Sequence, residues 1–132
     1  MLNDFYDIPA ETLLLVMVGE DDTVAGDAAA KTIFQTSERI PASRKNYVIQ
    51  RTDSYGQPNL KANHSAPLCI PDTELVNAMD YYSTWKLFDG LIDYAFYGIH
   101  QEYCLGNTPE LRFMGIWSDG TPVRELLVPD HP

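Results

Sequence analysis

The sequence predicts an α/β fold, in which parallel strands alternate with helices. Residues 13–19 carry no charge and are typical of a strand that is buried on both faces of a parallel sheet. A helical pattern over 28–37 separates this run from a second strand-like segment, 46–51. A strand, a helix and a second strand in this order predict the βαβ unit of a parallel sheet, with a right-handed crossover.

The first strand, 12–18, is followed directly by three carboxylates, Glu20, Asp21 and Asp22. In open α/β sheets, ligands bind outside the carboxyl ends of the strands, so we expect these side chains at the functional edge. Asp27 then begins the helix, either as its N-cap or as an acid in its first turn, where the helix dipole favours negative charge.

The second strand, 46–51, leads into a loop rich in turn-forming residues, 52–59, and from there to His64. Because the carboxyl ends of parallel strands meet at the same edge of a sheet, the loop that carries His64 is expected to open beside the three carboxylates. The sequence therefore predicts that an acid and a histidine meet at this edge.

A long helix is predicted after Pro71, with Asp72 or Thr73 as its cap and Gly98 at its end. Apolar residues recur along it at three- and four-residue steps and predict one core-facing stripe, made of Leu75, Met79, Tyr82, Trp85, Phe88, Ile92 and Ala95.

Between the apolar runs 113–117 and 122–128, the segment 118–120 contains Asp-Gly, which predicts a terminal β-hairpin. We expect one domain, 1–132. It consists of a sheet part with the acid and histidine loops (1–71), a helical part (72–105), and a hairpin with its tail (106–132).

Composition restricts the classes of partner. The 132 residues are 45% hydrophobic and 21% charged, as in ordinary globular proteins, and the formal net charge is −10. This charge repels phosphate groups, so neither nucleic acid nor an anionic membrane surface is an expected partner. Neither a signal peptide nor a membrane-spanning run is recognisable, and we expect a cytoplasmic protein.

No cofactor and no metal are expected. His100 and His131 have no companion at ligand spacing, and the acidic residues 20–27 lack the loop pattern of an EF-hand. Cys69 and Cys104 have neither metal-binding nor redox spacing. Two buried free thiols are the favoured interpretation, with a disulfide as the open alternative.

An acid and a histidine at neighbouring strand ends can form two thirds of a nucleophilic triad. A carboxylate that accepts a hydrogen bond from one ring nitrogen holds the imidazole in the tautomer whose other nitrogen can take a proton. Asp22 or Asp21 could be this acid, and His64 the base.

With these residues, the sequence resembles the C-terminal part of the α/β-hydrolase family over roughly 9–67. Gly19, Asp22 and Val24 are spaced as in that family's acid-bearing strand end, and a histidine loop follows the next strand. The resemblance implies an α/β-hydrolase-like parallel sheet on which the long helix packs. It also implies that Asp22 is the triad acid and His64 the base, with Asp21 as the competing acid.

The family's nucleophile motif, Gly-x-Ser-x-Gly, does not occur in the sequence. Ser118 comes nearest, but its preceding glycine is one position too far away and it follows His64 in the chain. We therefore expect the C-terminal fragment of a serine-type hydrolase, esterase-like or lipase-like, that acts on a small ester-like substrate together with a missing N-terminal half. Alone it should be inactive.

The alternative is a non-catalytic interaction module. Two strands leave an unpaired edge and an uncovered apolar face, and both invite a partner whose sheet this chain would complete.

Overall fold

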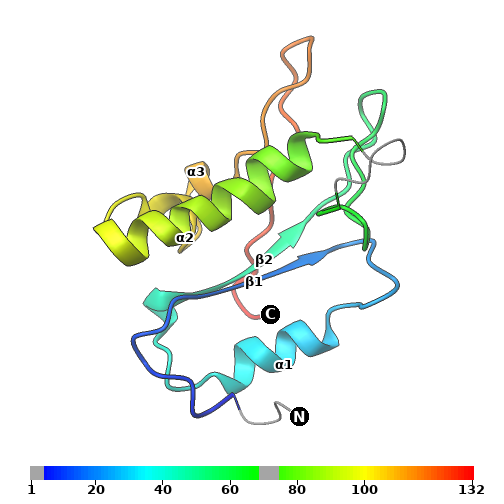
Figure 1. Ribbon diagram of the computed structural model, residues 1–132. Coiled ribbons are helices and arrows are strands. Elements are labelled where there is room, and N and C mark those ends of the chain that lie inside the picture. The colour runs from blue at the N-terminus through cyan, green and yellow to red at the C-terminus, as the bar shows by residue number, and fades with distance from the viewer. Residues whose placement is uncertain (1–4, 69–74) are drawn as a thin grey trace.

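A two-stranded parallel sheet lies at the centre of the computed structural model, which describes residues 5–68 and 75–132. β1 (Leu14–Gly19) pairs along its whole length with β2 (Lys45–Gln50). α1 (Ala28–Thr36) connects them and covers one face of the sheet, whereas α2 (Lys86–Tyr97) lies over the other face (Figure 1). The chain is thus a small mixed α/β fold, and the predicted βαβ unit is confirmed.

Shorter helices complete the described elements. η1 (Ala42–Arg44) precedes β2, and η2 (Asp80–Trp85), a π-helical segment, leads directly into α2. η3 (Gln101–Tyr103) and α3 (Pro109–Arg112) follow α2. Gly98 ends α2 with a φ of 69°, in the left-handed region that glycine adopts without strain, as predicted.

The long helix begins later than predicted. Residues 75–77 are not helical, and the expected caps Asp72 and Thr73 lie outside the described residues. Of the predicted stripe, Met79 is buried, whereas Leu75, Trp85 and Phe88 are exposed. The core-facing assignment is therefore wrong for most of the stripe, because the π-helical turn widens the helix and changes which side chains share a face.

The C-terminal segment forms a turn where a regular hairpin was predicted. Ile116 and Pro122 form a single antiparallel bridge around the Asp-Gly turn, and no strand continues it in the described chain. Further on, Leu127 forms an antiparallel bridge with Ile49 of β2. The second run therefore contacts the first run at Pro122 and the sheet at Leu127.

The core lies between the sheet and α2. Its buried residues come from β2, the loops after it, α2 and the C-terminal segment: Val48, Leu60, Ala62, Met79, Leu87, Leu111, Met114, Val123 and Leu126. All six residues of β1 are partly exposed, so the prediction that this strand is buried on both faces is wrong. β2 is more deeply buried because it lies between β1 and the Leu127 segment.

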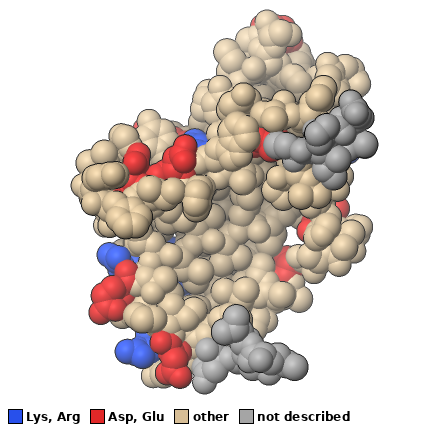
Figure 2. Space-filling model, viewed as in Figure 1, with Lys and Arg blue, Asp and Glu red and all other residues tan. Residues whose placement is uncertain are grey.

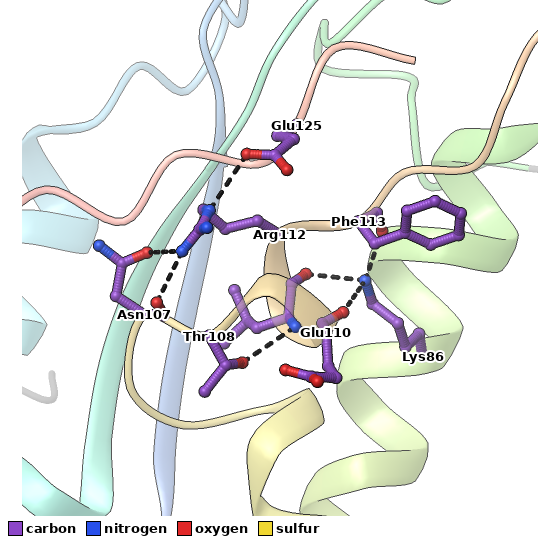
Figure 3. Close-up of polar contacts among 8 residues, drawn as sticks. Lys86, Asn107, Thr108, Glu110, Arg112, Phe113 and Glu125 are labelled. Atoms are coloured by element: carbon purple, nitrogen blue, oxygen red, sulfur yellow. Dashed lines mark hydrogen bonds and ion pairs between the residues drawn. The ribbon is translucent and has the colours of Figure 1, made fainter. Parts of the chain in front are cut away.

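α3 is attached to α2 by a partly buried lysine. Lys86 Nζ donates to the main-chain carbonyls of Glu110, Leu111 and Phe113, at 3.0, 2.7 and 2.6 Å (Figure 3). Burial lowers the pKa of Lys86 to about 8, and its ammonium neutralises the negative end of the short helix.

Cys104 is a buried free thiol, and its burial raises its pKa to about 11. This confirms the favoured interpretation for Cys104, whereas Cys69 lies outside the described residues. No helix in the described ranges is long and apolar enough to cross a membrane.

Candidate functional site

Asp22 and His64, 42 positions apart in the chain, contact each other where the two strands end. His64 Nδ1 lies 3.0 Å from Asp22 Oδ2. Asp22 stands just after β1, and His64 lies on the loop that leaves β2. The parallel arrangement of the strands brings the two predicted residues together, while their roles as acid and base stay a prediction.

The Asp22 carboxylate is held in one orientation by its own turn. Its Oδ1 accepts hydrogen bonds from the backbone N–H groups of Val24 and Ala25, each at 2.9 Å, which leaves Oδ2 for His64. The Ala25 N–H, together with His64 and the Val24 N–H, lowers the pKa of the Asp22 carboxyl below its ordinary value. Asp22 is therefore an anion at neutral pH, with Oδ2 directed at His64 Nδ1.

Gly19 lets the His64 loop lie directly against β1. A Cβ at this position would come 2.3 Å from the carbonyl oxygen of Ala62. That same carbonyl accepts a hydrogen bond of 3.0 Å from the N–H of Asp21. The loop is thus bonded to the end of β1 two residues before His64.

The structure distinguishes the two aspartates by their partners. Asp21 Oδ2 accepts from the hydroxyl of Thr52, and the same hydroxyl accepts a 3.0 Å bond from the N–H of Ala62. The Asp21 carboxylate therefore fixes the start of the loop that carries His64, whereas the Asp22 carboxylate contacts the imidazole. Of the two aspartates, Asp22 is thus the one next to His64, and it is also the acid that the family resemblance favours.

The Glu20 carboxylate has partners of its own, which the sequence did not predict. Its Oε1 accepts from the N–H of Thr52 at 2.7 Å and from Arg124 Nη1 at 2.6 Å. Arg124 Nη1 also donates to the Thr52 carbonyl at 2.9 Å. No local pattern links Arg124 to the strand ends, because it arrives from the far end of the chain.

His64 faces outward. Its side chain is 52% exposed, whereas that of Asp22 is 14% exposed. Nδ1 is bound to Asp22, and the described residues supply no hydrogen-bond partner for Nε2. A hollow of about 410 Å³ adjoins the imidazole, lined by residues 16–19 of β1, by Ala25, Ala29 and Ile33 near α1, and by Asn63. A reacting group could therefore reach Nε2 from this side.

A second histidine–aspartate pair lies at the far end of α2. His100 Nδ1 is 2.7 Å from Asp93 Oδ2, and both side chains are at least one-third exposed, at 49% and 34%. The sequence analysis missed this pair because it considered His100 only as a metal ligand. It lies away from the strand ends, next to the ring of Tyr103, and it makes a useful control for the Asp22–His64 pair.

In the part of the chain that the structure describes, no three His, Cys, Asp or Glu side chains are grouped so that they could hold a metal ion.

Comparison with protein-family models, with curated proteins and with solved structures finds no match for this chain.

Proposed function

We propose that Asp22 and His64 are the acid and base of a serine-type hydrolytic site like that of the α/β-hydrolases, with the serine contributed by polypeptide outside this sequence. One observation carries the proposal: the bond between His64 Nδ1 and an ionised, oriented Asp22, at the carboxyl ends of parallel strands, with Nε2 open beside a hollow.

The chemistry follows from the arrangement of the ring nitrogens. Asp22 accepts a hydrogen bond from Nδ1–H and so selects the tautomer in which Nε2 carries a lone pair. Nε2 removes the proton from the serine hydroxyl as its oxygen attacks the ester carbonyl. The imidazolium, stabilised by Asp22, then returns the proton to the departing alkoxide, and water hydrolyses the acyl-enzyme by the same route.

The substrate class proposed is a small ester, of esterase or lipase type. The isolated chain should not hydrolyse it, because the sequence lacks the Gly-x-Ser-x-Gly motif of an activated serine.

The first test is made on the chain alone. Long-range ¹⁵N–¹H NMR spectra report which ring nitrogen carries the proton. Neutral His64 is expected as the Nδ1–H tautomer in the wild type, and Asp22→Asn should remove this preference. A neutral ring protonated on Nε2 in the wild type would contradict the proposal.

The second test uses the native assembly that contains this chain, treated with a fluorophosphonate, which labels activated serines. His64→Gln and Asp22→Asn should each slow the labelling by on the order of 10³-fold or more. His100→Gln, which removes the ring of the control pair, should leave the rate unchanged. Equal labelling in His64→Gln and in the wild type would exclude His64 as the base.

A further inference from the structure

In the described part of the chain, β1 has one paired edge and one open edge. Its ladder partner is β2, and no other described strand lies beside it. The N–H of Glu20 donates to Gln50 at the end of β2, and backbone groups alternate in direction along a strand. The N–H and C=O groups of Leu15 and Met17 therefore point away from β2, toward the open edge.

Hollows lie on both faces of the sheet beside this strand. The hollow on the α1 side is the one next to His64, and it runs along residues 16–19. On the α2 side, a hollow of about 340 Å³ is bounded by Leu13 and Glu11 before β1, by Arg44 before β2, and by Leu91, Ile92 and Phe96 of α2. The strand is thus accompanied by open space against both helices.

The side of α2 that lines the second hollow is apolar. We call this side the α2 flank, which consists of Leu91, Ile92, Ala95 and Phe96 together with Phe88, one turn earlier on the same side of the helix. Phe88 is 62% exposed and Phe96 is 77% exposed, and the flank carries no charge. Figure 2 shows largely uncharged surface between α2 and α1.

Two segments with the composition of a protein core are therefore partly open. The uncharged run 13–19 has the composition of a strand buried on both faces, and the α2 flank contains Phe88, Ile92 and Ala95 of the predicted core-facing stripe. Leu13 and Ile92 border the same hollow, so the two segments are adjacent. Only an extended segment satisfies a strand edge and also fits between two helical layers, because it pairs its backbone and buries side chains on both faces.

Charge argues against a second copy of this chain as the occupant. Glu11 precedes β1 and Asp21 follows it, while Arg124 neutralises Glu20. Antiparallel pairing of two β1 strands would bring Glu11 of each copy against Asp21 of the other, and each chain has a net charge of −10. A segment with basic residues at its ends would instead complement Glu11 and Asp21.

We propose that the open edge of β1 binds an extended segment of another polypeptide, apolar on both faces and flanked by Lys or Arg, which joins the sheet as an added strand. The docking does not depend on the catalytic role proposed for His64.

The test uses the whole chain and three synthetic peptides. The first is a run of valine and isoleucine flanked by lysines, the second has the same run flanked by glutamates, and the third is the lysine peptide with a central proline. Amide hydrogen exchange measured by NMR reports on Leu15 and Met17. At saturation the lysine peptide should slow their exchange by about tenfold or more, since both amides become hydrogen-bonded. The glutamate peptide should bind at least about tenfold more weakly, and the proline peptide should give no protection.

Matched variants locate the contact. Phe88→Glu, on the α2 flank, should weaken binding of the lysine peptide by about tenfold or more, because a charge would face an apolar strand. Tyr97→Glu is the control, since Tyr97 is 73% exposed and lies outside the flank. It should bind like the wild type.

Two results would overturn the inference. In one, the lysine peptide leaves the exchange of Leu15 and Met17 unchanged. In the other, these amides become protected without peptide as the chain concentration rises, which would identify a second copy as the occupant. The exchange of Leu15 and Met17 is measured independently of the His64 tautomer, so a failure of docking is distinguishable from a failure of the proposed chemistry.

Discussion

Gly19 determines how closely the His64 loop approaches β1, because any side chain there would meet the Ala62 carbonyl. Gly19→Ala should push the loop away, break the contact between Asp22 and His64, and destabilise the fold by about 1–3 kcal/mol. The His64 ring signals in NMR and a urea unfolding curve would report both effects. Gly98→Ala serves as the control, since it strains a helix end at a φ of 69° far from the site. It should lower stability without moving the His64 signals.

Asp22 also links the site to pH. Hydrogen bonds from Ala25 and His64 lower the pKa of its carboxyl, so the folded chain binds this proton more weakly than the unfolded chain does. This difference in pKa stabilises the folded chain above the ordinary carboxyl pKa. The stabilisation is lost as the pH falls through the pKa that Asp22 has in the folded chain. From about pH 5 to pH 3, the wild type should therefore lose more stability than Asp22→Asn. Urea midpoints measured across this range would test it, and parallel curves would contradict it.

The junction between α2 and α3 depends on one partly buried ammonium. Lys86→Met removes the donor shared by the carbonyls of Glu110, Leu111 and Phe113, and we expect a loss of about 1–3 kcal/mol in the free energy of unfolding. Lys61→Met is the comparison, because Lys61 is exposed, and it should change stability by less than about 0.5 kcal/mol. Equal effects of the two substitutions in urea unfolding would show that the three hydrogen bonds contribute little.

The helical elements also show how a regular pattern fails. The stripe from Leu75 to Ala95 has helical spacing, yet η2 interrupts the α-helical geometry, and Asp80 and Ser83 are buried in place of Tyr82 and Trp85. The side chain of Gln50 donates to the Ser83 hydroxyl, so a polar contact with β2 helps to select the buried face. The spacing of apolar residues along the sequence does not predict this contact.

For the molecule as a whole, Asp53 joins the loop after β2 to the C-terminal segment. Its buried carboxylate accepts from Arg124 N–H at 2.8 Å and Trp117 Nε1 at 3.1 Å. Burial alone would raise the pKa of this carboxyl, but the Arg124 and Tyr55 N–H groups and the Trp117 indole outweigh it and lower the pKa.

Asp53→Ala should therefore cost about 2–4 kcal/mol and expose the Trp117 indole to solvent, which would shift its fluorescence to the red. Asp119→Ala removes an exposed carboxylate that accepts from the Tyr55 hydroxyl, and it should destabilise the fold much less than Asp53→Ala does. A red shift as large in Asp119→Ala as in Asp53→Ala would argue against Asp53 as the anchor of this segment.

The sequence by itself determined the βαβ unit, the end of α2 at Gly98, and the meeting of an acid with His64 at one edge of the sheet. These features follow from apolar periodicity, from glycine's tolerance of positive φ, and from the rule that parallel strands end on the same side. All three act within short segments or through the direction of the chain.

Only the tertiary structure decided that Asp22 and not Asp21 contacts His64, that Arg124 neutralises Glu20, and that β1 is less buried than β2. It also decided that the C-terminal run, beyond its single bridge to Ile116, joins β2 through Leu127. Each of these outcomes depends on hydrogen bonds and packing between segments distant in the chain. Local patterns encode the conformation of each segment, but the partner that a side chain finds depends on where the other segments lie.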